Sequence, residues 1–261
     1  MSSLTIAYIF LFYIAVLVFV GGLFYRLFEY VMVPAPLKIP TTPAPLTRKG
    51  VALRLGWEIA LFKSLFRGSK WIWLFGWMFH IALLLVLFRH LRYFIDPVWT
   101  WVALIQPLGI YASFAMLVGL LVLWARRFFL ERIRYISVFS DHFILILLVA
   151  IVGSGLVMKY GVRPDIVALK GFMLGIMHFD WKPFPGTGLG ESVNFVLLFH
   201  LFLVAILMML FPFSKLMHGI GLFFCPTRNQ VDNPRAEPGL RSHESRHVAR
   251  WAVNVESTAN S

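Results

Sequence analysis

Cysteine and acidic side chains are scarce in this sequence of 261 residues. It contains one cysteine, Cys225, and 12 Asp and Glu residues against 24 Lys and Arg residues. A single cysteine excludes a disulfide framework and excludes an iron–sulfur cluster held by this chain alone. No C-x-x-C-H run is present, which excludes covalently attached haem. Any iron–sulfur centre that works with this chain must therefore belong to a partner.

Charge is also low for a water-soluble protein of this size. Only 14% of the residues are charged, whereas 59% are hydrophobic and 16% aromatic, a balance that indicates lipid as the surrounding solvent. A helix of roughly 20 apolar residues spans a bilayer core. The first apolar run is too long for a signal peptide, and no basic residue precedes it. The predicted fold is an all-α, five-helix membrane bundle with helices at about 4–30, 71–95, 101–125, 141–160 and 193–217.

The domain organisation follows from where the apolar runs stop. We expect a five-helix membrane domain over residues 1–225 and a polar cytoplasmic tail over residues 226–261, because the tail lacks any apolar periodicity. Residues 50–70 form a basic, apolar stretch that we interpret as an interfacial helix. Its charged residues fall on opposite sides of one continuous helical wheel and interrupt the polar stripe, which a bend or a covering partner would explain. Residues 161–192 are expected to cap the outer side of the bundle, with Trp181 as an aromatic anchor.

The formal net charge of +12 raises the question of nucleic-acid binding. The Lys and Arg residues, however, lie in the connections between apolar runs and not on one face of a domain. They concentrate at residues 38–70, 126–134 and 228–250. By the positive-inside rule these regions are cytoplasmic, so the sequence predicts a multi-pass protein of the cytoplasmic membrane with its N-terminus outside and its C-terminus inside, and no nucleic-acid partner.

Four of the eight histidines lie in or at the ends of two predicted spans. His80 and His90 are ten residues apart in the second, and His200 and His218 are eighteen apart in the fifth. These separations correspond to rises of roughly 15 and 27 Å along a helix. Because the two helices are expected to be antiparallel, His80 pairs with His218 inside and His90 with His200 outside. Helix tilt and a kink at Pro212 would compensate for the difference between these two rises.

An imidazole buried in lipid needs a hydrogen-bonding group or a metal ion as its partner. An interhelical hydrogen bond is the simple explanation for one histidine, but four histidines at two depths favour two b haems, each held by two imidazoles. A zinc site would need four donors converging on one point, and the two levels are too far apart. An H-E-x-x-H run in the tail, from His243 to His247, has the spacing of a zinc protease but no third ligand or folded cleft around it.

Further candidate residues flank these histidines. Arg126 and Arg127 are candidates for binding haem propionates, and the alternative is that they are cytoplasmic anchors. Arg89, Arg92 and Tyr93 follow or precede His90 and are candidates for a quinone pocket. No catalytic residue is expected.

The sequence also resembles a known family. The histidine spacings resemble those of the respiratory nitrate reductase gamma subunits, which are five-helix dihaem cytochromes b. The runs W-E-I-A-L-F-K-S-L-F-R, F-R-H-L-R-Y-F, F-P-F-S-K-L-M-H and P-T-R-N resemble the narrower DsrM family, cytochrome b subunits of the DsrMKJOP complexes of dissimilatory sulfur metabolism. The longer first connection and the P-T-R-N run depart from nitrate reductase and agree with DsrM.

This resemblance implies a function and partners. It implies two b haems ligated by His80, His90, His200 and His218. It also implies electron exchange between a membrane quinone and a cytoplasmic iron–sulfur subunit like DsrK, within a complex of other Dsr subunits. The alternative is a membrane anchor or proton-relay transporter subunit without haem, which would usually carry acidic residues deep in its spans; almost none lie there.

Overall fold

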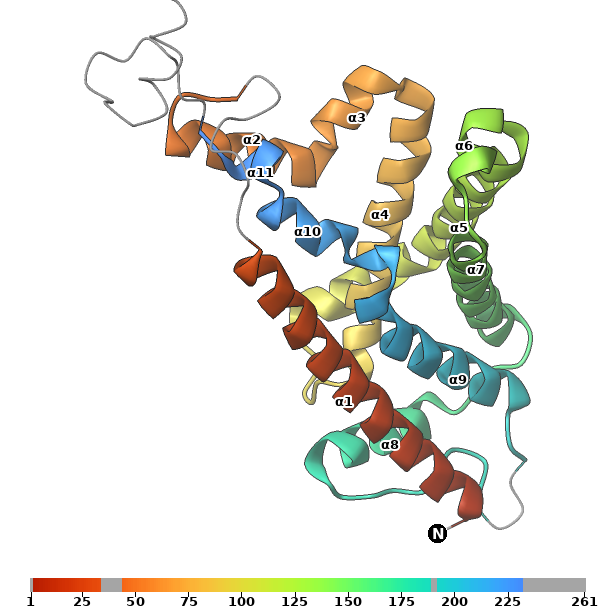
Figure 1. Cartoon of the computed structure of the whole chain (residues 1–261). Helices are drawn as coiled ribbons and strands as arrows, with labels where there is room; N and C mark the ends of the chain where they lie inside the picture. The colour runs from red at the N-terminus through yellow and green to blue at the C-terminus, as the bar shows by residue number, and fades with distance from the viewer. Residues whose placement is uncertain (1, 34–43, 189–191, 232–261) are drawn as a thin grey trace, which may run out of the picture. The chain divides into compact units, whose positions relative to one another are not determined.

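The computed structural model describes residues 2–33, 44–188 and 192–231, and every regular element in those ranges is a helix (Figure 1). This confirms the all-α class. Residues 232–261 lie outside the described ranges, and so does the H-E-x-x-H run at 243–247. The polar tail therefore stays a prediction.

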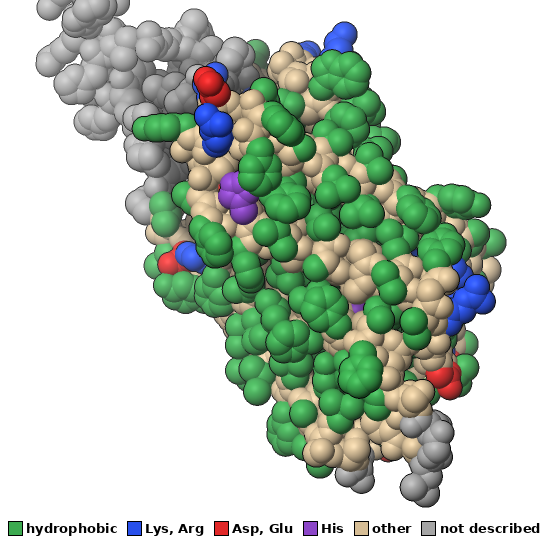
Figure 2. Space-filling view, turned by 90° about the vertical axis from the view of Figure 1, so that its right-hand side faces the viewer, with side chains coloured by type: hydrophobic (Ala, Val, Ile, Leu, Met, Phe, Trp, Pro, Cys, Tyr) green, Lys and Arg blue, Asp and Glu red, His purple; other side chains and the backbone are tan. Residues whose placement is uncertain are grey.

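Within the described residues, five helices are long and apolar enough to cross a membrane, as the sequence predicted. Figure 2 shows one face of the molecule, where hydrophobic side chains cover most of the surface and charged side chains lie near its margins. The helices are α1 (Ser3–Met32), α4 (Lys70–His90, continued by the 3-10 turn η1, Leu91–Tyr93), α5 (Thr100–Phe129), α7 (Phe139–Tyr160) and α9 (Phe195–Leu210, continued by η2, Phe211–Phe213).

The chain divides into two compact units, each described by itself. The larger unit contains Met1–Met32 and Leu61–Gly219, and with them all five long helices. The smaller unit contains Val33–Ala60 and Ile220–Ser261. It holds most of α2 (Arg48–Leu61) and of α10 (His218–Phe224), together with α11 (Pro226–Asn229). Within it, an ion pair of 3.1 Å joins Arg228 to Glu58.

The predicted interfacial helix over residues 50–70 is two helices in the structure. α2 ends at Leu61, and α3 occupies Lys63–Gly68. Phe62 between them has a φ of 48°, a left-handed conformation that an α-helix cannot continue through. The bend expected from the interrupted polar stripe is therefore located at Phe62.

The larger unit has two hydrophobic cores. One is formed by α4, α5 and α7, with Phe79, Met116 and Leu148 among its buried side chains. The other is formed by α1, α9 and α8 (Ile166–His178), with Phe12 and Phe172 among its buried side chains. α9 also packs against α7 and so links the two groups.

α8 was not predicted from the sequence, which indicated only a cap on the outer side of the bundle. Its N-cap is Asp165, whose carboxylate accepts hydrogen bonds from the backbone N–H groups of Val167 and Ala168. Trp181, predicted as an interfacial anchor, donates its indole N–H to the hydroxyl of Tyr13 over 2.9 Å. The cap is thus attached to α1 by a specific hydrogen bond.

The last span ends earlier than predicted. The sequence indicated one helix over about 193–217 with a kink at Pro212, but α9 stops at Leu210 and is followed by η2 and a second 3-10 turn, η3 (Lys215–Met217). Pro212 lacks an N–H group and its ring clashes with a continuing helix, which explains the break. The carbonyl of Pro212 accepts a 3.3 Å hydrogen bond from Arg26 of α1.

Close packing of α4 and α5 depends on a small residue. A Cβ atom at Gly119 would lie 3.0 Å from the Cβ of Phe79 and 3.2 Å from the carbonyl oxygen of Phe75. At Gly109, ten residues earlier, a Cβ would meet the side chain of Arg89, ten residues later on α4. These two contacts fix the antiparallel register of the pair.

We predict that Gly119→Val forces α4 and α5 apart and lowers stability by about 1–3 kcal/mol, the usual cost of overpacking. The measurement is the thermal unfolding midpoint in detergent. Gly21→Val is the matched control, because a Cβ at Gly21 meets nothing within 4 Å. Equal midpoints for the two variants would show that the close approach at Gly119 does not limit packing.

Candidate functional site

The four histidines singled out in the sequence lie in two pairs. The ring of His80 in α4 is 5.8 Å from the ring of His218, centroid to centroid, with the planes 81° apart. The ring of His90, the last residue of α4, is 6.4 Å from that of His200 in α9, with the planes 14° apart. The structure thus brings together the residues that antiparallel spans were expected to bring together.

The separation within each pair suits one metal ion between two imidazoles. Bonds from a metal ion to imidazole nitrogen are about 2 Å long, and each ring centre lies about 1 Å beyond its nitrogen, so two rings on opposite sides of an ion have centroids about 6 Å apart. Both measured separations lie close to this value. Each pair therefore fits the two axial positions of a haem iron.

The second nitrogen of each ring is already occupied. A backbone carbonyl or a hydroxyl lies within hydrogen-bond distance of every Nδ1, and a carbonyl can only accept. Nδ1 therefore carries the proton, and Nε2 keeps a lone pair for a metal. The partners are Gly76 O for His80 (2.6 Å), Val86 O for His90 (2.6 Å), Lys215 O for His218 (2.8 Å) and Ser154 Oγ for His200 (2.9 Å).

Ser154 is a site residue that the sequence analysis missed. Its hydroxyl in α7 donates to the carbonyl of Ala150 over 2.7 Å, so its oxygen is left to accept the Nδ1 proton of His200. Ser154 and His200 are 6% and 8% exposed, which makes this a bond between two buried groups. The available signal was a serine between two glycines in an otherwise apolar span.

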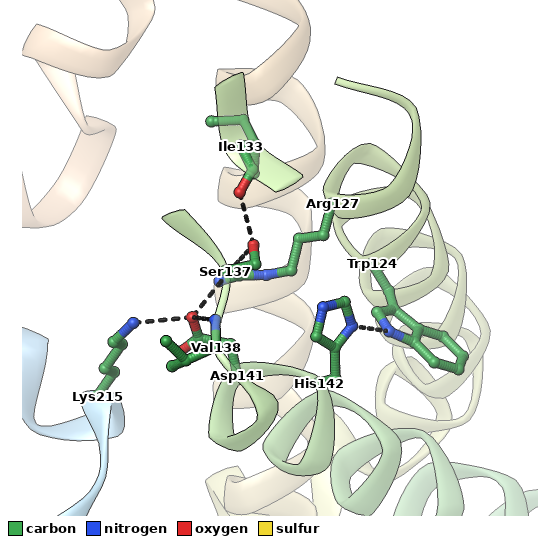
Figure 3. Close-up of polar contacts among 8 residues, drawn as sticks. All are labelled: Trp124, Arg127, Ile133, Ser137, Val138, Asp141, His142 and Lys215. Atoms are coloured by element: carbon green, nitrogen blue, oxygen red, sulfur yellow. Dashed lines mark hydrogen bonds and ion pairs between the residues drawn. The ribbon is translucent and has the colours of Figure 1, made fainter. Parts of the chain in front are cut away.

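His218 is supported by a charged network. Lys215, whose carbonyl bonds the His218 ring, extends its ammonium group to Asp141 Oδ2 over 2.8 Å. Asp141 also accepts from Arg127 at 3.3 Å, and Arg127 donates to Ser137 Oγ at 3.0 Å (Figure 3). The guanidinium of Arg127, a predicted propionate ligand, is thus engaged within the protein.

Arg126, the other predicted propionate ligand, differs from its neighbour. Its Nε is buried and has no hydrogen-bond partner among the described residues. Since Phe79 faces Gly119, Arg126 lies about two turns beyond the level of His80 along α5. Its guanidinium group and its position along α5 make Arg126 suited to bind an anionic group at that end of the bundle.

The residues predicted to bind a quinone lie beside His90, Arg89 at the end of α4 and Arg92 and Tyr93 in η1. The ring of Tyr93 is 6.0 Å from that of His90. Arg92 donates to the side chain of Gln106 over 3.2 Å, and Gln106 donates in turn to the carbonyl of Arg89. These bonds tie η1 to α5, so Arg92 has a structural role that the sequence did not indicate.

A cavity of about 540 Å³ opens next to this turn. It begins at Phe94, the residue after Tyr93, and combines apolar walls with ionisable side chains. α8 packs against η1 and provides its other wall. The lining residues are Phe94, Ile95, Asp96, Leu174, Gly175, His178, Asp180 and Lys182.

Two further histidines have separate roles. His142 accepts a 3.2 Å hydrogen bond from the indole of Trp124 (Figure 3), and His178 bonds the carbonyl of Leu174 over 2.9 Å. Across the described ranges, no three His, Cys, Asp or Glu side chains converge as a metal site. The two histidine pairs are therefore the arrangement that bears on cofactor binding.

Comparison with known proteins assigns the chain to a family. Residues 60–233, which include all four paired histidines, match the family described as nitrate reductase gamma subunit. The "Hdr-like menaquinol oxidoreductase cytochrome b-like subunit" of Archaeoglobus fulgidus is 37% identical over 279 residues, covering 92% of this chain and 81% of that protein. The protein of the same description from Archaeoglobus profundus is 33% identical over 287 residues, covering 94% and 82%. The chain therefore belongs to the nitrate reductase gamma subunit family.

Proposed function

We propose that this protein is the cytochrome b subunit of a membrane complex that exchanges electrons between the quinone pool and a cytoplasmic iron–sulfur protein. The observation that carries the proposal is the geometry of the two histidine pairs. Each pair has the separation required by one shared iron, and every Nδ1 is held so that Nε2 can bind it.

Two b haems fit the donor set. His80 with His218 would hold one, and His90 with His200 the other. A haem with both axial positions filled by imidazole leaves no open site on iron and carries one electron at a time. Arg126 is the side chain best placed to pair with a propionate, since its Nε has no partner within the described residues.

The basic connections give the orientation that we propose. The His80–His218 pair lies at the end of the bundle that carries Arg126, Arg127 and Lys215, and the positive-inside rule makes this end cytoplasmic. We call the haem site of this pair the inner site and that of His90 and His200 the outer site. Ten residues of α4, a rise of roughly 15 Å, separate the two levels.

The quinone is proposed to react at the outer site. The relatives from Archaeoglobus are described as menaquinol oxidoreductase subunits. The cavity beside η1 offers apolar walls for a quinone ring, and its wall begins at Phe94, the residue after Tyr93, whose ring is 6.0 Å from that of His90. Oxidation of a quinol to a quinone releases two electrons and two protons, and His178, Asp96 and Asp180 in the cavity wall can accept protons. The same groups return protons in the reverse direction.

The partner is proposed to be an iron–sulfur subunit like DsrK, within a complex of the Dsr type that serves dissimilatory sulfur metabolism. The chain itself has one cysteine and cannot hold such a cluster alone. Both Archaeoglobus relatives carry the description Hdr-like, which supports a soluble partner similar to heterodisulfide reductase. The basic loops and the tail after Arg228 are the surfaces that we propose for docking.

We predict that His218→Ala and His200→Ala each remove one of two haems, because each deletes half of one ligand pair. The measurement is haem content per chain together with the reduced-minus-oxidised visible spectrum. His142→Ala is the matched control and should keep both haems, since His142 bonds Trp124 and not another histidine. A wild-type preparation that stays colourless with adequate haem supply would favour the alternative of an anchor or proton-relay subunit.

The cavity predicts a second result. His178→Phe should remove a hydrogen-bonding and proton-accepting group from its wall and raise KM for a soluble menaquinol analogue on the order of tenfold, which corresponds to about 1.4 kcal/mol, with both haem spectra unchanged. Val167→Phe is the control, because Val167 lies on the same helix, is 81% exposed and does not line the cavity. An unchanged KM in His178→Phe would exclude the cavity and direct attention to Arg89 and Tyr93.

Removal of the residues after Arg228 should weaken co-purification with the iron–sulfur subunit and leave haem content unchanged. The deletion keeps the Arg228–Glu58 ion pair, so α2 and α11 retain their contact. The measurement is the amount of partner recovered per haem. Full recovery of the partner would assign docking to the loops alone.

A further inference from the structure

His218 differs from the other three paired histidines in how its backbone is held. His80, His90 and His200 belong to long helices. His218 follows two 3-10 turns that replace the end of the last span, and its own helix, α10, has only seven residues. Short 3-10 segments have poor hydrogen-bond geometry and provide little rigidity. The position of His218 must therefore depend on contacts from outside this segment.

Lys215 provides one such contact, because it is bonded at both ends. Its carbonyl oxygen lies 2.8 Å from Nδ1 of His218, and its Nζ lies 2.8 Å from Oδ2 of Asp141. The lysine side chain is 70% exposed, whereas the Asp141 side chain is 3% exposed. Burial therefore holds the Asp141 side chain in place, whereas the exposed Lys215 side chain can adjust its conformation.

Asp141 is held by two further donors besides Lys215. It accepts from the backbone N–H of Val138 and from Arg127, both at 3.3 Å. Figure 3 shows that these donors approach the carboxylate from the end of α5, from the connection before α7, and from η3. A cap for α7 would need only the Val138 bond. The two cationic partners indicate that the carboxylate joins three segments.

We propose that Asp141 is a positioning residue of the inner haem site, acting through Lys215 on the imidazole of His218. This inference rests on the proposed function, since it requires a haem between His80 and His218. Asp141 does not touch the haem. It fixes η3 against α5 and α7, and the Lys215 carbonyl then sets the direction in which His218 presents Nε2.

A purely electrostatic role for these residues makes a different prediction. Removing a negative charge near an iron makes reduction easier, and removing a positive charge makes it harder. Asp141→Asn and Lys215→Met would then shift the midpoint potential of the inner haem in opposite directions. If both residues act by positioning His218, both variants weaken the same axial bond and shift that potential in the same direction.

The experiment compares Asp141→Asn and Lys215→Met in the full-length chain. We expect both to shift the inner haem's midpoint potential the same way and to raise its high-spin fraction, with the outer haem unchanged. The double variant should do no more than the stronger single variant, because both break one connection. His200→Ala and His218→Ala identify which signal belongs to which haem. Asp141→Glu and Lys215→Arg should restore much of the wild-type signal.

Glu131→Gln is the matched control, because Glu131 is an exposed acidic residue in α6 (Glu131–Ile136), next to the same end of α5. It should leave both haems unchanged. Opposite shifts in Asp141→Asn and Lys215→Met would overturn the proposal in favour of an effect of charge. Equal changes at both haems, or lower stability with an unchanged inner signal, would reduce Asp141 to a structural residue.

The test still gives an answer if one variant does not fold, and it separates failure of the positioning role from failure of the proposed function. If Asp141→Asn does not fold, Lys215→Met still decides the question through the high-spin fraction of the inner haem, which an effect of charge alone would leave unchanged. This variant alters only an exposed lysine and leaves the buried carboxylate with Arg127. If the wild-type protein contains no inner haem, the proposed function fails first, and the positioning role of Asp141 fails with it. If the wild-type protein contains both haems and neither variant changes the inner haem, the positioning role alone is refuted.

Discussion

The hydrogen bond at Nδ1 of each paired histidine is the interaction on which the site depends. At the buried His200 it satisfies a polar atom that is shielded from water, and in all four histidines it leaves Nε2 as the nitrogen able to bind a metal. In α4 the acceptor is a carbonyl one turn earlier in the same helix, so His80 and His90 are oriented locally. For His200 the acceptor is Ser154 of α7, so its orientation depends on packing between helices. For His218 the acceptor is the carbonyl of Lys215, three residues earlier, and the lysine is itself bonded to Asp141 of α7.

This difference follows the division of the larger unit into two cores. α4 packs into the core of α5 and α7, and Gly119 lets its backbone approach closely. α9 belongs to the core with α1 and α8 and also contacts α7. The His90–His200 pair joins the two groups of helices, since His90 lies in α4 and His200 in α9. α7 serves both pairs from one helix, since Ser154 lies toward one of its ends and Asp141 at the other.

Some charged residues near the histidine pairs form hydrogen bonds within the protein, whereas another keeps a donor without a partner among the described residues. Arg127 and Arg92 were both predicted to contact a cofactor or substrate; in the structure Arg127 bonds Asp141 of α7 and Arg92 bonds Gln106 of α5. Burial makes such bonds valuable, because a charge removed from water must be compensated nearby. Arg126 keeps a buried Nε without a partner in the described part of the chain, which separates it from Arg127 although the two are adjacent in sequence.

The sequence by itself determined the class of fold, the five apolar helices and the two levels of His80 and His90 along α4. These features depend on length, composition and helical rise, which are local properties. It could not determine the break between Leu210 and His218, the helix α8, or the partners Ser154 and Asp141. Each of these depends on which atoms meet through space: Pro212 stops α9, but only the contacts of η3 with α5 and α7 decide where His218 then lies. Tertiary packing therefore decided how His200 and His218 are oriented, because the acceptor of His200 comes from α7 and Lys215, which bonds His218, is itself bonded to Asp141 of α7.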